Sequence, residues 1–407
     1  MPKIAAINCH KVLNSRGNWT IETHVKLDDG AAGSQSIPEG ASKGENEAIS
    51  LPVDKAVEVV TTVINDALID EDPFNQQKID STMIEMDGTA NKKCLGGNSM
   101  LSVSMATAKA CANSRGWQLW EYLSFIFSGQ KKNKVDLKYP APLFNILNGG
   151  KHAHNNLSFQ EFVVIPAQGT PITQALEMGT TIYHILQKKL EAEGFDVDVG
   201  DEGGFAPNGL TVEKALLFIR GAASQQYKIG SQVFLGMDVA AESFYSQGSY
   251  AIKEENFKGS NLKLINYYEK LLKKFELMYV EDPFYEKDFE GWKQFMSKFG
   301  SKLLVVGDDL VVTNKSILQS VITDNLINAV IVKPNQIGTL TETFDFIKLA
   351  KSAKMATIIS HRSGDTAEDT FIADLALATD AEFLKAGAPV RGERVAKYNR
   401  LLEILEG

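Results

Sequence analysis

The sequence predicts an α/β protein in which a smaller α+β domain precedes a closed β/α barrel of the TIM type. Three observations predict this fold. Strand and helix patterns are grouped in the first part of the chain, short apolar runs alternate with amphipathic stretches in the rest, and 407 residues exceed the ~250 that one barrel needs. We therefore expect an α+β domain over residues 1–127, a linker over 128–142 and the barrel over 143–407.

The first part of the chain reads as a hairpin followed by helices. Residues 19–27, WTIETHVKL, alternate apolar and polar side chains, and a turn signal follows at 28–30. The stretches 45–70 and 97–113 have helical patterns, and the second is rich in Ala, Ser and Met, which permits close packing. The segment 128–142 then carries a basic polar run and two prolines, which is typical of a linker.

Helix boundaries in the second part are marked by capping residues. Thr170-Pro171 offers an N-cap followed by proline at the first helical position, and Gly194 would end that helix. Thr339 with Glu342 makes a capping box for a later helix. We expect such helices to alternate with the strands of a parallel sheet, as βα units do.

The composition of the chain argues against several classes of function. The net charge of -9 argues against a nucleic-acid binder, which needs a basic face. No apolar run approaches the ~18 residues of a membrane span, and the first residues lack the apolar stretch of a secretory signal. The three cysteines form no CxxC pair, which argues against a disulfide framework or a thiolate zinc site. We expect a cytoplasmic protein that binds no nucleic acid and does not insert into membranes.

Charged or polar residues recur where the apolar runs end. The last five of six such positions are 24 to 28 residues apart, the length of one βα unit. One such residue alone is best explained as a helix cap or a solvated side chain, but six in register indicate one shared site at the C-terminal mouth of the barrel. The positions are Asp238, Glu281, Asp308, Lys333, His361 and Lys385.

The order of these charges suggests two neighbouring subsites. Asp238, Glu281 and Asp308 supply three carboxylates that would repel one another without a cation, and oxygen ligands of this kind favour Mg²⁺. Cationic side chains follow in the sequence and would hold an anionic substrate. They are Lys333, His361, Arg362 and Lys385.

Two earlier segments add polar groups near the start of the barrel. A loop with two glycines carries His152, and Gln160 and Glu161 stand at the start of the next strand. His152 and His154 could also be a solvated loop pair. Glu202 lies between an aspartate and two glycines, and its alternative role is that of an ordinary turn carboxylate.

Several long motifs resemble one known family. GDEGGFAPN, VEDPF, GDDLVVTN, KPNQIGTLTET, SHRSGDTAEDTFIADLA and APVRGERVAKYNRLLEIL are similar to segments of the enolases, the phosphopyruvate hydratases, and the resemblance runs from NSRGN at residue 14 to the C-terminus. It implies an enolase-type barrel, preceded by a capping domain with a mobile loop. It also implies a lyase of glycolysis and gluconeogenesis that reversibly dehydrates 2-phosphoglycerate to phosphoenolpyruvate. Homodimers or larger homo-oligomers are expected, and some family members also occur at the cell surface or are secreted.

The resemblance implies a role for each candidate residue. Two Mg²⁺ ions serve each active site in the family, the first bound by Asp238, Glu281 and Asp308 and the second, which arrives with substrate, by Ser42. Lys333 matches the base that removes the C2 proton, and Glu202, with Glu161 beside it, matches the acid that assists loss of the C3 hydroxyl. The remaining matches are to substrate-binding residues, namely His152, Gln160, Glu161, His361, Arg362, Ser363 and Lys385.

These roles set expectations for protonation. Lys333 must be neutral to act as a base, so burial, the cations and Lys385 are expected to lower its pKa. Glu202 must be protonated to act as an acid, and an acidic, partly buried surrounding would raise its pKa. The two groups need surroundings that act in opposite directions.

Departures from the family are confined to the first domain. Asn14 and Trp19 replace the usual aspartate and proline, Lys43 replaces a small hydroxyl residue, and a stretch is missing after Ala48. Lid closure, binding of the second metal and the dimer contact are the properties that these changes affect. A catalytically impaired paralogue that acts as a binding or surface protein is therefore an alternative. A dehydratase or racemase for unphosphorylated acid sugars is a further one.

Overall fold

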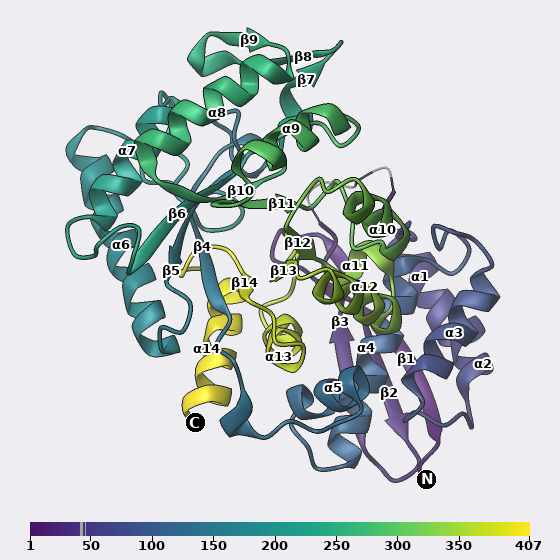
Figure 1. Cartoon of the computed structure of the whole chain (residues 1–407). Coiled ribbons are helices and arrows are strands. Elements are labelled where there is room, and N and C mark those ends of the chain that lie inside the picture. Colours follow the sequence, from purple (N-terminus) through teal and green to yellow (C-terminus); the bar gives the residue numbers. More distant parts are fainter. Residues whose placement is uncertain (41–43, 45) are drawn as a thin grey trace.

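The computed structural model describes residues 1–40, 44 and 46–407. The chain begins with a three-stranded antiparallel sheet in the order β1 (Ile4–Leu13), β2 (Trp19–Leu27) and β3 (Ala32–Ser36). The predicted hairpin is confirmed, since β2 pairs with β3 across the 28–31 turn. One face of the sheet packs on helices, and the apolar side chains between them form a separate core (Figure 1).

The helices of this part follow the sheet. They are α1 (Val53–Val59), the π-helical turn η1 (Val60–Ile64), α2 (Asn65–Leu68), α3 (Gln76–Asp87), α4 (Gly97–Ser114) and α5 (Leu119–Ser128). The prediction of a helix from residue 45 is wrong at its start, because α1 begins only after Pro52. The preceding backbone instead bonds to distant segments, with Ala48 N–H donating to Gln336 O at 2.8 Å and Ile49 N–H to Asn91 O at 2.8 Å.

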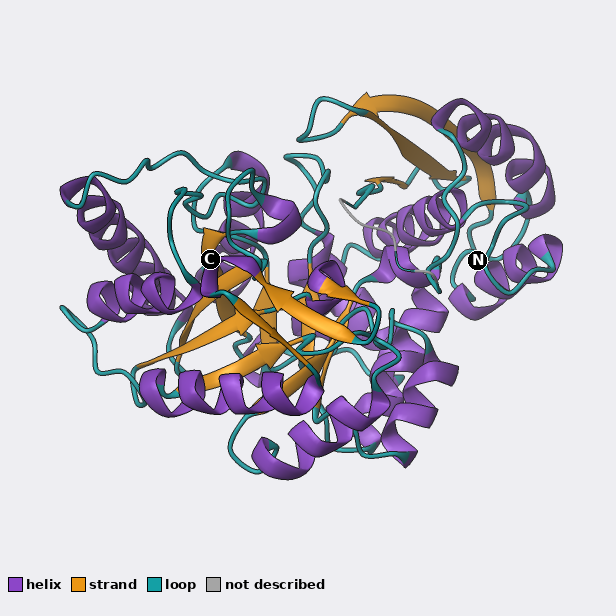
Figure 2. Ribbon diagram, turned by 90° about the horizontal axis from the view of Figure 1, so that it is seen from above, coloured by secondary structure: helices purple, strands orange, loops and turns teal. Residues whose placement is uncertain are grey.

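The rest of the chain closes into the predicted barrel. Its strands are β4 (Ala141–Asn148), β5 (Glu161–Pro166), β6 (Val233–Asp238), β10 (Leu277–Glu281), β11 (Leu304–Gly307), β12 (Ala329–Val332), β13 (Ala356–Ser360) and β14 (Phe383–Lys385). Figure 2 shows these strands at the centre with helices around them and the first sheet apart at one side. Apolar side chains such as Val163, Ile331 and Ile358 fill the interior.

One strand corrects the expectation of a parallel sheet. β5 runs antiparallel to both of its neighbours, pairing Asn148 with Glu161 and Glu161 with Asp238. The connection from β4 to β5 contains only a single 3₁₀ turn, η3 (Gly150–His152), and no α-helix, and the chain returns to the barrel at the rim where β4 ends. The start of β5 therefore lies at the same rim as the ends of the parallel strands.

Helices cover the outside of the barrel. They are α6 (Ile172–Ala192), α7 (Val212–Ala223), α8 (Asn261–Phe275), α9 (Phe289–Phe299), α10 (Lys315–Thr323), α11 (Pro334–Ile337), α12 (Leu340–Ser352), α13 (Phe371–Ala378) and α14 (Gly392–Glu406). A small sheet of β7 (Tyr245–Ser246), β8 (Ser249–Ile252) and β9 (Phe257–Gly259) is inserted after β6. The insertion explains why Asp238 and Glu281 are farther apart in sequence than the later strand ends.

The capping predictions hold in part. Thr339 caps α12, since its hydroxyl accepts from Glu342 N–H at 3.2 Å, and Gly194 follows the end of α6 with a left-handed φ of 77°. The prediction for Thr170 is wrong. Pro171, which has no side-chain acceptor, itself occupies the N-cap of α6, because α6 begins one residue later than expected.

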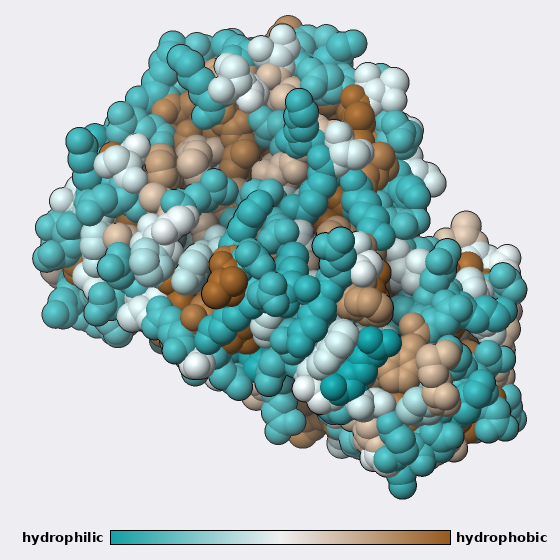
Figure 3. Space-filling model, turned by 60° about the horizontal axis from the view of Figure 1, so that its bottom comes forward, coloured by the Kyte–Doolittle hydropathy of each residue, from teal (hydrophilic) through white to brown (hydrophobic). Residues whose placement is uncertain are grey.

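The segment between the two parts contains a short 3₁₀ turn, η2 (Lys134–Asp136), between the end of α5 and the start of β4. The division at residues 128–142 stays a prediction. Among the described residues, no helix is both long and apolar enough to cross a lipid bilayer. The face seen in Figure 3 is largely hydrophilic, with small scattered hydrophobic patches.

Candidate active site

The polar strand ends meet in one cavity at the barrel mouth. β6, β10 and β14 end at Asp238, Glu281 and Lys385, and Asp308, Lys333 and His361 directly follow β11, β12 and β13. Most of the predicted residues line the cavity, namely His152, Gln160, Glu161, Glu202, Asp238, Asp308, Lys333, His361, Arg362, Ser363 and Lys385. Glu281 is fully buried and contacts Lys385 at 2.8 Å. The structure thus brings together every predicted site residue that it describes.

The direction of β5 explains the position of Glu161. Because β5 is antiparallel, its first residue pairs with the last residue of β6, so Glu161 lies beside Asp238. Gln160, just before the strand, donates to Asp238 Oδ2 at 3.2 Å. Two residues from the beginning of a strand thus join a rim otherwise built from strand ends.

Lys385 is the centre of a cluster of carboxylates. Its ammonium lies 2.8 Å from Glu281, 3.2 Å from Asp238 and 3.2 Å from Glu161, and all four side chains are nearly inaccessible to solvent. Burial lowers the pKa of Lys385, but the three carboxylates outweigh it and hold that pKa well above its ordinary value. Lys385 is therefore charged, and it partly neutralises the acidic cluster.

Lys333 forms a second ion pair in the same cavity. Its ammonium contacts Asp308 Oδ2, and the amide of Gln336 donates to the other oxygen of Asp308 at 3.2 Å. The Thr313 hydroxyl accepts from Lys333 N–H at 2.9 Å and fixes the backbone where β12 ends. The carboxylate at the end of β11 is thereby held toward the cavity.

The donor set of these strand ends fits a magnesium ion. Asp238, Glu281 and Asp308 offer only carboxylate oxygens, which hard divalent cations prefer, and they lie on the neighbouring strands β6, β10 and β11. In the described part of the chain, the donor atoms of these three residues do not all lie within 4.8 Å of one another. Lys385 lies between Asp238 and Glu281, and Lys333 binds Asp308. The two lysine ammonium groups therefore neutralise the carboxylates that a metal ion would bind.

Glu202 lies between two histidines. His152 Nδ1 is 3.4 Å from Glu202 and 3.5 Å from Glu161, and His361 Nε2 is 3.4 Å from Glu202 on the other side. Asn145 also donates to Glu202 Oε2 at 3.0 Å. These contacts make Glu202 part of a buried network rather than an isolated turn carboxylate. They also place His152 in the cavity rather than in a solvated loop.

The protonation of this network corrects both expectations. Burial lowers the pKa of Lys333, as expected, but the contacting Asp308 outweighs burial and raises it above the ordinary value. Burial raises the pKa of Glu202, yet the two histidines hold it well below its usual range. Burial and the facing Glu202 raise the pKa of Glu161 instead, so Glu161 carries the proton of this carboxyl pair.

The anion side of the cavity is built around Arg362 and His361. Arg362 Nη1 lies 3.0 Å from Glu47, which belongs to the first part of the chain. Gly40 N–H donates to Ser363 O at 2.9 Å, and a Cβ at Gly40 would lie 2.5 Å from the Arg362 guanidinium. Gly40 also has a left-handed φ of 82°, so glycine is required at this contact.

Several residues of the site were not predicted from sequence. Arg394, fully buried in α14, contacts His361 Nδ1 and lies 3.3 Å from Asp365. A donor at Nδ1 leaves the proton of a neutral His361 on Nε2, the atom that faces Glu202. Burial lowers the pKa of His361 to about 4, which favours this neutral form. Arg394 lies in the C-terminal motif APVRGERVAKYNRLLEIL, which is the sequence signal that could have identified it.

Of the residues that depart from the family pattern, Asn14 lies in the described part of the chain. Asn14 is buried, and its side chain accepts from the backbone N–H groups of Arg16 and Asn18 at 2.9 and 3.0 Å, closing a tight loop. Arg16 in this loop pairs with Asp201, next to Glu202, at 3.1 Å. Ser42, expected to bind the second metal, and Lys43 lie outside the described residues.

Comparison with protein families agrees with the motifs. The family model for the C-terminal TIM barrel domain of enolase matches residues 136–407. The model for the N-terminal domain of enolase matches residues 4–123. Together the two matches cover almost the whole chain, in the order in which the sheet and the barrel follow one another.

Proposed function

Because the chain belongs to the enolase family, we propose that it is a magnesium-dependent lyase that reversibly converts 2-phosphoglycerate to phosphoenolpyruvate in glycolysis and gluconeogenesis. The observation that carries the proposal is the cavity in which Lys333, the Glu161–Glu202 pair and the basic residues of the anion side lie together. Each group has a separate task in the reaction. The substrate is a small phosphorylated carboxylate.

The anion side binds and orients the substrate. We infer that Arg362 and Ser363 hold the phosphate, with His361 and Lys385 as further contacts. His152 and Gln160 also line the cavity. Burial of these groups strengthens their interaction with an anion and excludes water from the reacting carbon.

Proton transfer falls to Lys333 and to the carboxyl pair. The Lys333 amine removes the C2 proton, and the proton that the Glu161–Glu202 pair carries passes to the departing C3 hydroxyl. Lys333 can act only after it has lost its own proton, which its ion pair with Asp308 opposes. When bound by Asp238, Glu281 and Asp308, Mg²⁺ would neutralise the charge that grows on the substrate carboxylate and compete with Lys333 for Asp308. We assign a second Mg²⁺ to Ser42, as in the family.

A direct assay tests the proposal. Purified protein, 2-phosphoglycerate and Mg²⁺ are mixed, and the absorbance of the enol product is followed. We expect turnover that excess EDTA abolishes and added Mg²⁺ restores. Turnover that persists without any divalent metal would refute the metal assignment.

A non-catalytic paralogue is the second candidate. The shortened segment after Ala48 favours it. The ion pair between Glu47 and Arg362 also favours it, because it neutralises a guanidinium that would otherwise bind the phosphate. No turnover from folded, Mg²⁺-loaded protein would support this candidate. Turnover at a rate typical of enzymes would exclude it.

Family membership also supports a homodimer or larger homo-oligomer and a cytoplasmic location. Light scattering coupled to size exclusion measures the first property. A mass of about one chain, 44.7 kDa, would contradict it. Fractionation of cells with an antibody against the chain measures the second.

A further inference from the structure

Outside the residues that line the barrel cavity, three side chains converge on the exposed face of the first sheet. His10 lies on β1, and Glu22 and His24 lie on β2. Glu22 and His24 are two residues apart on one strand, so their side chains share one face, and His10 pairs directly with Glu22 across the ladder. A rigid two-stranded scaffold therefore positions all three groups.

The donor atoms of this trio are close to a metal-binding arrangement. Glu22 Oε1 lies 2.9 Å from His24 Nε2 and 3.8 Å from His10 Nε2, and all three donor atoms are within 4.8 Å of one another. Ligands about 2.1 Å from a tetrahedral zinc ion are about 3.4 Å apart. The two measured separations bracket that value, so side-chain shifts of about half an ångström complete the geometry.

A second observation argues against an ordinary hydrogen-bonded cluster. Nε2 of His24 has almost no exposed surface and makes no hydrogen bond, although the Glu22 carboxylate lies only 2.9 Å away. The imidazole rings of His10 and His24 are stacked, with centroids 5.0 Å apart and planes inclined by 23°. The nitrogen and the carboxylate are thus close together without a hydrogen bond between them.

We propose that His10, Glu22 and His24 form a binding site for a divalent transition-metal ion of the zinc class. Two imidazole nitrogens and one carboxylate oxygen leave a fourth position for water, and this donor set selects zinc-like ions over Mg²⁺. The side chains are partly exposed, at 54%, 23% and 45% in chain order, so the site lies at the protein surface.

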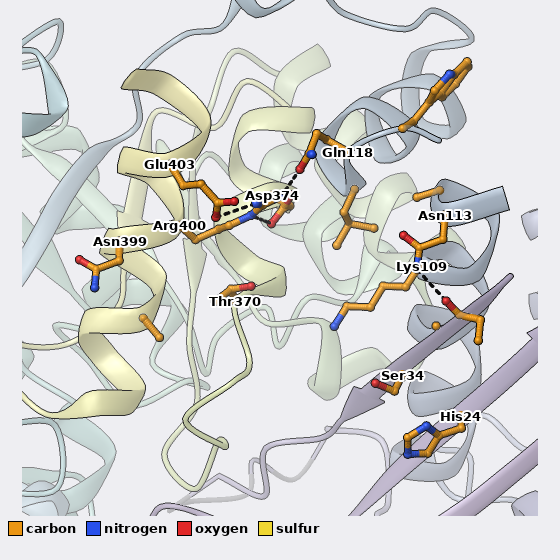
Figure 4. Close-up of a pocket in the computed structure, with 16 residues that line it drawn as sticks. His24, Ser34, Lys109, Asn113, Gln118, Thr370, Asp374, Asn399, Arg400 and Glu403 are labelled. Atoms are coloured by element: carbon orange, nitrogen blue, oxygen red, sulfur yellow. Dashed lines mark hydrogen bonds and ion pairs between the residues drawn. The ribbon is translucent and has the colours of Figure 1, made fainter. Parts of the chain in front are cut away.

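None of the three side chains of this site lines the barrel cavity. His24 also lies at the edge of a groove between the first sheet and α14 (Figure 4). The charged side chains on the far side of this groove pair among themselves, Arg400 with Asp374 at 2.8 Å and with Glu403 at 2.9 Å. They therefore do not compete for an ion held by the trio.

The test measures zinc binding by the full chain in excess Mg²⁺, which occupies the oxygen-rich site. Equilibrium dialysis against a zinc buffer gives the number of ions and their affinity. His10→Ala and His24→Ala are each expected to lose one zinc ion per chain or to bind it at least tenfold more weakly. Glu22→Gln, which preserves the shape of the side chain, is expected to weaken the same ion.

The matched control is His184→Ala, which removes an exposed histidine of α6 outside the trio and is expected to bind zinc as the wild type does. Circular dichroism verifies that each variant is folded. Equal zinc stoichiometry and affinity in all five proteins would overturn the proposal. So would a zinc-soaked crystal whose anomalous signal appears only in the barrel cavity.

Discussion

Lys333 shows how one side chain combines two demands of the site. It must be held within reach of the substrate, which its buried ion pair with Asp308 achieves, and it must also be able to lose a proton, which the same pair opposes. The residue types of the site could be predicted from sequence, because strand ends recur at regular spacing. The protonation of Lys333 and Glu202 could not be predicted, because the groups that shift their pKa values come from different strands and loops.

Replacing Lys333 tests its role as the base. Lys333→Ala is expected to reduce kcat by several orders of magnitude, since no proton acceptor remains at that position. The enol-absorbance assay measures this change. The control Lys315→Ala removes an exposed lysine whose ion pair with Asp345 is 2.9 Å long, and it should leave kcat within about twofold, as surface ion pairs contribute little. Near-normal turnover by folded Lys333→Ala protein would remove Lys333 from the mechanism.

Gly40 tests the anion side of the cavity. Gly40→Ala places a methyl group 2.5 Å from the Arg362 guanidinium, so we expect KM for 2-phosphoglycerate to rise roughly tenfold through loss of one charge-assisted hydrogen bond. Gly30→Ala is the matched control, because Gly30 has a similar φ of 91° and nothing within 4 Å of the added Cβ. If both variants change KM equally, backbone strain rather than displacement of Arg362 is responsible.

At the scale of elements, the contact between α3 and α12 joins the first part of the chain to the barrel. Asp80 on α3 accepts from Thr341 N–H at 2.9 Å and from its hydroxyl at 2.6 Å, and Gln76 donates to its other oxygen at 3.1 Å. Burial raises the pKa of Asp80 from 3.8 to about 6 in spite of these bonds. The folded state therefore holds a proton that the unfolded chain releases.

This shift predicts a pH dependence of stability. Between pH 3.8 and about 6 the folded state binds more protons at Asp80 than the unfolded state, so the contribution of Asp80 to stability falls as the pH rises through this window. The change is of the order of 3 kcal/mol. Asp80→Asn should remove this component from the profile of unfolding midpoint against pH. An unchanged profile would show that Asp80 does not titrate there, and Asp345→Asn serves as the exposed control.

Two elements have features that their sequence patterns do not predict. β5 was recognised as a strand, but an apolar run has no direction, and the antiparallel pairing of β5 with β4 depends on the fold around it. The helix expected from residue 45 starts at Val53, because the preceding backbone bonds to Gln336 and Asn91, which are distant in sequence. Strand positions follow from local periodicity, whereas these features depend on partners elsewhere in the fold.

At the scale of the whole molecule, the chain buries a group of charged side chains at one end of the barrel. Lys385 and three carboxylates are nearly fully buried together, and burial and the nearby Asp238 raise the pKa of Glu281 to about 8. Residues from the first part of the chain complete the enclosure, since Glu47 pairs with Arg362 and Arg16 with Asp201. A cation bound at the strand ends should relieve the repulsion that remains among these carboxylates.

Magnesium is therefore expected to stabilise the whole protein. An ion that binds only the folded state raises the free energy of unfolding by about 2.7 kcal/mol at a concentration of 100 Kd. The midpoint of thermal unfolding should rise with Mg²⁺ and fall again with EDTA. Asp308→Asn should lose most of this rise, and Asp54→Asn, which alters an exposed carboxylate, should keep it. An equal rise in both variants would place the ion elsewhere.

The reversed strand β5 also affects how the molecule can diversify. The loop over residues 149–160 leaves the barrel at the catalytic rim and returns to it at the same rim, and it carries His152 and Gln160. Both of its ends are anchored by neighbouring strands, so evolution or a protein engineer can exchange its exposed residues if Phe159, which packs on Tyr267 and Tyr268 of α8, is kept. Substrate preference can thus be redesigned in one continuous stretch of chain while the proton-transfer residues Lys333 and Glu202 stay in place.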